Sequence, residues 1–179
     1  MDVSYINPFI TATSQLFATM IQVQLTLGKP SIRKPDDRLF KLYRISAAID
    51  LQGGVSGRVA ISLSPQVAYA LGGALAGRPF EKPDAELLDA IGEIANMIVG
   101  GAKTTLPDGG SVRISTPQVM ATHLLEYPAG LPVIIIPFDT PAGRFVLETA
   151  LRVAAKPASA PTPTPTPTAI APAAPAQAA

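Results

Sequence analysis

The strongest constraint on the fold is a repeated order of elements along the chain. Two segments share a phrase, GRVAISL at 57–63 and GRFVLET at 143–149. Each returns the chain after another strand-like segment, and each half of the chain begins with a helix-like segment. Hairpins between neighbouring strands imply a largely antiparallel sheet. We therefore predict an α+β domain whose helices pack on a largely antiparallel sheet, built from two helix–strand–hairpin pseudo-repeats.

The first half of the chain opens with a helix signal. Asn7 is expected to cap the helix, and Pro8 fits its first turn. Downstream, strict alternation of apolar and polar residues predicts strands, and a Ser-Pro pair predicts a further helix. The predicted elements are a half-buried strand at 21–27, a hairpin with strands at 43–51 and 59–63, and a helix from 64 to about 77.

The second half opens with a longer helix, expected from about 84 to 105. After it, an apolar run and two alternating segments indicate further strands. The predicted strands lie at 112–115, 119–126, 133–138 and 144–152. Together these elements would repeat the order of the first half.

Composition changes near Lys156, where the sequence becomes PASAPTPTPTPTAIAPAAPAQAA. Alternating proline favours extended polyproline II, and such a segment has little to bury. We therefore divide the chain into a folded domain at 1–153 and a disordered Pro/Ala/Thr-rich tail at 154–179. The tail is interpreted as a linker, a spacer or a dispensable segment, and a proline-motif ligand is the less favoured alternative.

Charge and residue usage exclude several kinds of site. The chain has 14 basic and 13 acidic residues with no basic face, so nucleic-acid binding is not expected. It has no cysteine and one histidine, His123, which leaves little for a metal site or a catalytic triad. The N-terminus does not resemble a signal peptide, and no apolar segment is long enough to span a bilayer. We expect a soluble cytoplasmic protein without membrane insertion.

The long predicted helix has a polar stripe opposite its apolar face. At about 100° per residue, five residues fall within a narrow band, whereas Leu87, Ile91 and Ile98 point the other way. The stripe consists of Asp89, Glu93, Asn96, Gly100 and Lys103. A glycine on this stripe would let a partner's backbone approach closely. On spacing alone, however, an ordinary solvated helix face is the better explanation of an acid and an amide at these positions.

The stripe and its surroundings resemble a known family. An Asp or Ser, then Glu four residues later, Asn after three more, and a proline some twenty residues on form the signature of the CheC/CheX/FliY phosphatases of bacterial chemotaxis. Here these residues are Asp89, Glu93, Asn96 and Pro117. The opening MDVSYINPFI and the stretch LDAIGEIANMIVGGAKT are similar to CheX in particular. The resemblance covers the chain up to the tail.

The resemblance implies an enzyme and assigns roles. The substrate would be a phosphorylated response regulator, CheY or another receiver domain, and the reaction hydrolysis of its aspartyl phosphate. Asn96 would orient the attacking water, and Glu93 would pair with a lysine of the regulator. Asp89, Gly100 and Lys103 would contact the partner, with Pro117 structural. The Mg²⁺ would belong to the regulator, so no cofactor or metal site is expected in this chain.

The resemblance also implies one site per chain and a homodimer joined edge to edge. When Met20 is matched with Met97, Leu16 takes the position of Glu93 and Thr19 that of Asn96, so the first helix lacks the pair. One alternative stays open. The chain could be a non-catalytic receiver-binding module like the middle domain of the flagellar switch protein FliM, which shares the fold but lacks the acid–amide pair.

Overall fold

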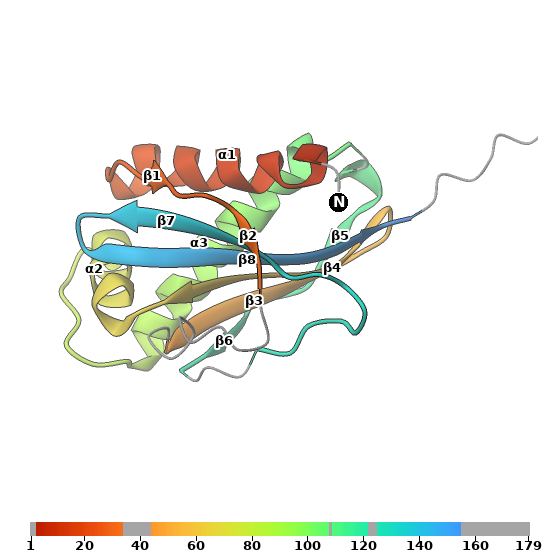
Figure 1. The fold of residues 1–179 in the computed structure, drawn as a ribbon. Helices are drawn as coiled ribbons and strands as arrows, with labels where there is room; N and C mark the ends of the chain where they lie inside the picture. Colours follow the sequence, from red (N-terminus) through yellow and green to blue (C-terminus); the bar gives the residue numbers. More distant parts are fainter. Residues whose placement is uncertain (1–2, 34–43, 108, 122–124, 155–179) are drawn as a thin grey trace, which may run out of the picture.

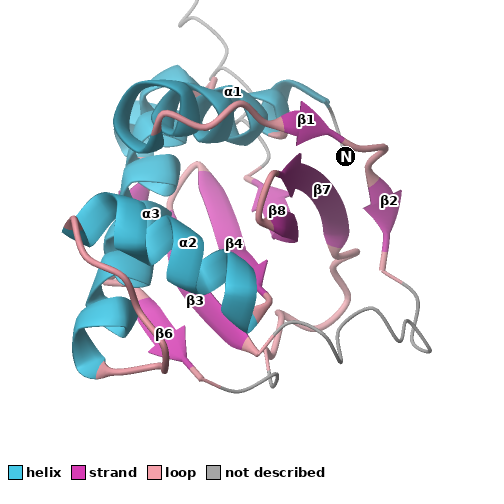
Figure 2. Cartoon of the chain, turned by 90° about the vertical axis from the view of Figure 1, so that its left-hand side faces the viewer, coloured by secondary structure: helices cyan, strands magenta, loops and turns pink. Residues whose placement is uncertain are grey.

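The computed structural model describes residues 3–33, 44–107, 109–121 and 125–154. Over these residues the chain forms an eight-stranded sheet in which every pair of neighbouring strands is antiparallel. Figures 1 and 2 show the three α-helices gathered on one side of this sheet. The helices are α1 (Asn7–Leu16), α2 (Pro65–Ala76) and α3 (Ala85–Thr105). The strands are β1 (Thr26–Leu27), β2 (Ser31–Ile32), β3 (Ile45–Gln52), β4 (Val55–Leu63), β5 (Arg113–Ile114), β6 (Gln118–Met120), β7 (Ile134–Thr140) and β8 (Gly143–Val153).

The sheet topology confirms the predicted fold class and the pseudo-repeat. The strand order is β1-β7-β8-β4-β3-β5, with β2 also paired to β7 and β6 also paired to β3. The short strands of each half therefore pair with the hairpin of the other half. The segments with the shared phrase, in β4 and β8, lie side by side at the centre, where Leu63 pairs with Phe145 and Gly57 with Leu151. The two halves thus form one sheet and one core.

The apolar core lies between the sheet and the helices. From α3, Ile98 and Val99 lie against Val59, Ile61 and Leu147 of the central strands. Phenylalanine rings fill the other end of the core. There the ring of Phe145 stacks on the rings of Phe17 and Phe138, and the ring centroids lie 5.1 and 5.2 Å apart. Burial of such large side chains supplies most of the driving force for folding. This packing holds α3 on the sheet along its apolar face.

The helix-free face of the sheet is also buried near its centre, which the alternation in β8 did not predict. Glu148 is fully buried there. Its carboxylate accepts a 2.8 Å hydrogen bond from Ser62 Oγ and lies 3.6 Å from Arg33 Nη1. Burial and the nearby Glu148 raise the pKa of Tyr127. Arg33 and Tyr127, from two loops far apart in the sequence, therefore cover this face near Glu148. As a result, the residues of β8 from Phe145 to Leu151 are buried on both faces of the sheet.

Two local predictions in the first half are wrong. Asn7 does not cap α1, because the N-cap residue is Ile6 and no side chain makes a capping hydrogen bond. The expected strand at 21–27 is reduced to Thr26–Leu27. The chain instead leaves α1 through a π-helical turn, η2 (Phe17–Ile21), and then Gln22 adopts a left-handed conformation with φ 57°. Ile21, Val23 and Leu25 are more buried than the polar residues between them, as predicted for a strand. They pack on the core from the end of η2 and from the segment without regular secondary structure that follows it.

The other elements agree with prediction to within a few residues. Ser64 caps α2, which ends at the left-handed Gly77. The hairpins and the helix expected at 84–105 are confirmed, whereas the strands expected at 112–115 and 119–126 are shorter. His123, Tyr43 and the tail from 155 onward lie outside the described residues. The division of the chain at residue 153 stays a prediction.

Candidate functional site on helix α3

Helix α3 has strong local signals at both ends. Asp84 caps it, because the Asp84 Oδ1 atom accepts a 2.9 Å hydrogen bond from the Leu87 backbone N–H. Glu86 in the first turn and Lys103 in the last turn have the charges that the helix dipole favours at those ends. The apolar residues at helical spacing then bury one face against the sheet. The helix and the direction of its polar stripe are therefore both specified by the sequence.

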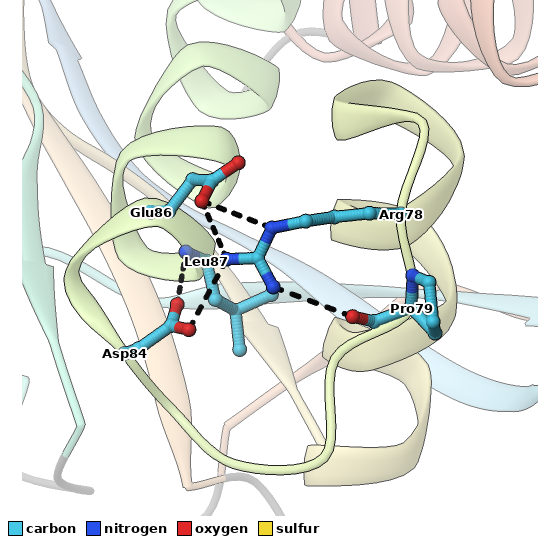
Figure 3. A network of polar contacts seen from close by, with 5 residues as sticks. All are labelled: Arg78, Pro79, Asp84, Glu86 and Leu87. Carbon is cyan, nitrogen blue, oxygen red and sulfur yellow. Dashed lines mark hydrogen bonds and ion pairs between the residues drawn. The ribbon is translucent and has the colours of Figure 1, made fainter.

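A network of polar contacts ties the start of α3 to the end of α2 (Figure 3). Arg78 donates from Nε to Glu86 Oε2 at 2.9 Å and from Nη2 to Asp84 Oδ2 at 3.2 Å. The guanidinium also lies over the Phe80 ring, 4.1 Å from its centroid. These ion pairs hold the pKa of Glu86 below its usual value, and the Leu87 N–H and Arg78 together lower that of Asp84.

The structure brings the five predicted stripe residues to the outer side of α3. Asp89 and Glu93 are exposed, whereas Asn96, Gly100 and Lys103 are partly exposed. Within the described part of the chain, the side chains of Glu93 and Asn96 have no hydrogen-bond or ion-pair partner. Since polar groups on a folded surface are free to bind water or a second molecule, this stripe is available to a partner.

The glycines of α3 differ in what surrounds them. A Cβ at Gly100 would meet no atom within 4 Å, so this position opens outward. A Cβ at Gly101 would lie 3.4 Å from Ala12 Cβ, because Gly101 faces α1. Gly100 therefore leaves a small gap on the outer stripe, one turn beyond Asn96, where a partner could approach the helix backbone.

Pro117 lies beside the stripe, and Gly92 makes its position possible. A Cβ at Gly92 would lie 3.7 Å from Pro117 Cβ and only 3.1 Å from Val119 Cγ2. The segment before β6 thus packs directly on α3 one residue before Glu93. The role of Gly92 was missed from the sequence, although an interior helical glycine costs about 0.5–1 kcal/mol and so signals a close approach.

The arrangement suits positioning chemistry more than metal or nucleophilic chemistry. Over the residues described, no cluster of three or more His, Cys, Asp or Glu side chains could hold a metal ion. An amide such as Asn96 is neither a base nor a nucleophile, but it can donate to and accept from a water molecule. Among the described helices, none is long and apolar enough to cross a membrane.

The fold and the site define a class: a CheC-like α+β protein with an acid–amide pair on one outward helix. A family model described as "Chemotaxis phosphatase CheX" matches residues 45–139, more than half of the chain. The chain belongs to the CheX family of chemotaxis phosphatases. No curated protein sequence matches it.

Solved structures agree with this assignment. A CheC-like superfamily protein from Shewanella sp. PV-4 has 28% identity and a TM-score of 0.76, covering 85% of this chain and 99% of that one. CheX from Desulfovibrio desulfuricans has 30% identity and a TM-score of 0.70, covering 83% and 98%. The CheX-CheY-BeF3-Mg²⁺ complex from Borrelia burgdorferi gives 24% identity and a TM-score of 0.69 over 84% and 99%, a likeness of fold. The predicted family is confirmed, and the roles of individual residues stay predictions.

Proposed function

We propose that this chain hydrolyses the aspartyl phosphate of a phosphorylated response regulator, CheY or another receiver domain. The observation that supports it most is the outward stripe of α3, where Glu93 and Asn96 lie one turn apart without a polar partner among the described residues. Membership of the CheX family adds support. So does the Borrelia burgdorferi complex, in which CheX is found with CheY, BeF3 and Mg²⁺.

An acyl phosphate needs little from the phosphatase. The water oxygen forms a bond to phosphorus while the bond from phosphorus to the aspartyl oxygen breaks, giving a free carboxylate, inorganic phosphate and a proton released to solvent. Such transfer depends mainly on positioning and charge stabilisation. In our proposal the Asn96 amide holds the water in line, and the regulator provides the Mg²⁺ for the phosphoryl oxygens. This chain then requires no cofactor or metal of its own.

Glu93 has a docking role in this proposal. It would pair with a lysine of the regulator, which fixes the phosphate relative to Asn96, one turn further along the helix. Asp89, Gly100 and Lys103 would contact the same partner, and Gly100 would permit a close approach. Pro117, packed near Gly92, would support this part of the helix from the side.

The decisive experiment mixes the protein with a panel of phosphorylated receiver domains and follows phosphate release. We expect at least one receiver to lose phosphate faster, and Asn96→Ala to reduce that gain about 10²-fold. Gln24→Ala removes an exposed amide away from α3 and is the matched control. If no receiver responds, the phosphatase proposal fails. A receiver that binds without a change in phosphate lifetime would identify the non-catalytic module instead.

Glu93→Ala separates docking from folding. Since Glu93 is exposed, its loss should weaken receiver binding and leave the melting temperature nearly unchanged. A large decrease in melting temperature would show that Glu93 is structural.

We also propose a homodimer, on the family resemblance. Over the described ranges of the chain, each edge of the sheet consists of two short strands separated by a segment with a proline, Pro30 between β1 and β2 and Pro117 between β5 and β6. The N–H and C=O groups that an edge strand leaves unpaired could bind the edge of a second copy, and the short, proline-interrupted edges would restrict this pairing to a few residues. Sedimentation analysis of the full chain tests the proposal, and a concentration-independent monomer would exclude it.

A further inference from the structure

The acidic residues of the candidate site do not end at Asp89. Asp84 caps α3 and Glu86 lies in its first turn, so four carboxylates span residues 84–93, about 14 Å along the helix. Glu86, Asp89 and Glu93 fall within about 60° of one another around the helix axis. A partner lysine approaching this side would therefore meet two acidic positions besides the one beside Asn96.

Arg78 occupies the two carboxylates that are farthest from Asn96. Its guanidinium contacts both Asp84 and Glu86, with Nε and Nη2 directed to the same Glu86 oxygen (Figure 3). Asp89 and Glu93 have no such partner within the described residues. The acidic side of α3 is thus divided into a start whose two carboxylates share one guanidinium and a pair next to Asn96 without a counter-ion in the part of the chain described.

Arg78 is a partly exposed counter-ion that several contacts hold in place. It follows Gly77, whose left-handed conformation (φ 70°) ends α2, and its guanidinium stacks on Phe80. Nη1 also donates to the Pro79 carbonyl at 3.4 Å. Because ring, carbonyl and carboxylates hold the group on several sides, a partner's lysine would have to compete with an arginine already in place.

We propose that Arg78 is a specificity-determining residue, which by occupying Asp84 and Glu86 prevents the receiver's lysine from docking at the start of α3. This inference rests on the proposed phosphatase function. A lysine docked at Glu86 would lie ten residues, about 15 Å, before Asn96, so the phosphate would be out of reach of the amide. Arg78 leaves Asp89 and Glu93 as the carboxylates open to the lysine, and of these two Glu93 lies one turn from Asn96, which holds the water.

The inference predicts a kinetic signature of non-productive binding. In Arg78→Gln, Asp84 and Glu86 become free to bind the lysine in the wrong register. Since this mode competes with the productive one without altering it, kcat and KM for the phosphorylated receiver should fall together, by about twofold to threefold at low salt, with kcat/KM unchanged. The effect should fade as added salt screens the exposed carboxylates.

Two further variants make the test specific. Arg144→Gln removes the same charge from a similar pair on the β7–β8 hairpin, where Arg144 binds Asp139 at 2.8 Å, and should leave both constants at wild-type values. The double variant Arg78→Gln with Glu86→Gln removes one of the two freed carboxylates, the one within the first turn of α3, and should return both constants towards wild type.

The outcomes are distinguishable. Equal effects of Arg78→Gln and Arg144→Gln, no change in Arg78→Gln, or a double variant that keeps the Arg78→Gln values would each overturn the inference. A fall in kcat/KM for Arg78→Gln would also overturn it, because Arg78 would then contact the receiver or position α3. If the wild-type protein accelerates no receiver's dephosphorylation, the proposed function itself fails.

Discussion

Helices α1 and α3 begin the two halves of the same pseudo-repeat, yet only α3 presents a polar stripe with charges. The two helices pack together where Gly101 faces Ala12. Residues 3–28, which include α1, contain no Asp, Glu, Lys, Arg or His, whereas α3 has three acids and a lysine. The side chains matched to the acid–amide pair also differ in placement. Leu16 is buried in the core, and Thr19 donates its hydroxyl to the Gln15 carbonyl at 2.8 Å.

This contrast shows that the fold supplies two helices and the residues on one of them supply the candidate site. Helix α1 buries, at Leu16, a position that α3 leaves exposed at Glu93. It also ends in a π-helical turn, whereas α3 continues as a regular helix through Lys103. A second site on α1 would therefore need a change of orientation as well as a change of residues.

The largest effect is expected when α1 receives the acid of α3. Leu16→Glu places a carboxylate at a position that is 8% exposed within the core. Because a buried charge without a partner is costly, the free energy of unfolding should fall by about 3 kcal/mol or more. Urea unfolding measures the change. Glu93→Leu, the reverse exchange at an exposed position, is the control and should have little effect on stability. A loss below about 1 kcal/mol in Leu16→Glu would mean that the two helices do not differ in burial as described.

The next effect comes from giving α3 the threonine of η2, the π-helical turn that follows α1. In Asn96→Thr, the hydroxyl is expected to bond the carbonyl four residues back, at Gly92, as Thr19 does with Gln15. The hydroxyl would then be turned toward the helix, and kcat for receiver dephosphorylation should fall about 10²-fold. Single-turnover phosphate release measures this, with circular dichroism to check folding. Near-normal turnover would show that Asn96 does not place the water.

The comparison also shows how far sequence reasoning reaches. The extent and orientation of α3 could be predicted, because a cap, a first-turn acid, helical periodicity and a last-turn lysine all agree at one place. The strand expected from Ile21 to Leu27 was wrong because alternating burial does not require strand pairing. Here a π-helical turn and a left-handed Gln22 redirect the chain. Neither has a distinct signature in residue spacing.

The sequence also did not predict contacts between segments that are far apart along the chain. Glu148 lies in a segment predicted as an alternating strand, and Arg33 and Tyr127 from two loops lie beside it. The glycine at position 92 is likewise explained by the close packing of Pro117 and Val119, which are more than twenty residues away in the sequence. The candidate site residues were predictable since they lie on one helix, whereas the side chains that support them come from elsewhere in the chain.

A smaller effect should distinguish the starts of the two helices. Helix α3 has the Asp84 cap and α1 has no side-chain cap. Asp84→Ala should lower the melting temperature by about 2–4 °C at pH 7. Because the Leu87 N–H and Arg78 hold the pKa of Asp84 below its usual value, the cap stabilises the fold above about pH 4 and loses this effect as the pH falls through the lowered pKa. The difference in melting temperature between the wild-type protein and Asp84→Ala should therefore shrink in acid.

Asp89→Ala, an exposed control, should change the melting temperature by about 1 °C at most. A pH-independent difference would contradict the role of the Asp84 carboxylate.

The smallest effect should separate the outward side of α3 from the side that faces α1. Gly100→Ala adds a methyl group in open space and should stabilise the helix by about 0.5–1 kcal/mol. The same methyl would occupy the gap beside Asn96, so binding of a phosphorylated receiver should weaken while stability rises. In Gly101→Ala the methyl meets Ala12 at an ordinary contact distance, away from the stripe, and receiver binding should not change. Calorimetry of receiver binding together with thermal unfolding measures both effects. If Gly101→Ala weakens binding and Gly100→Ala does not, the receiver docks on the α1 side of α3, and Glu93 and Asn96 cannot be the residues that meet it.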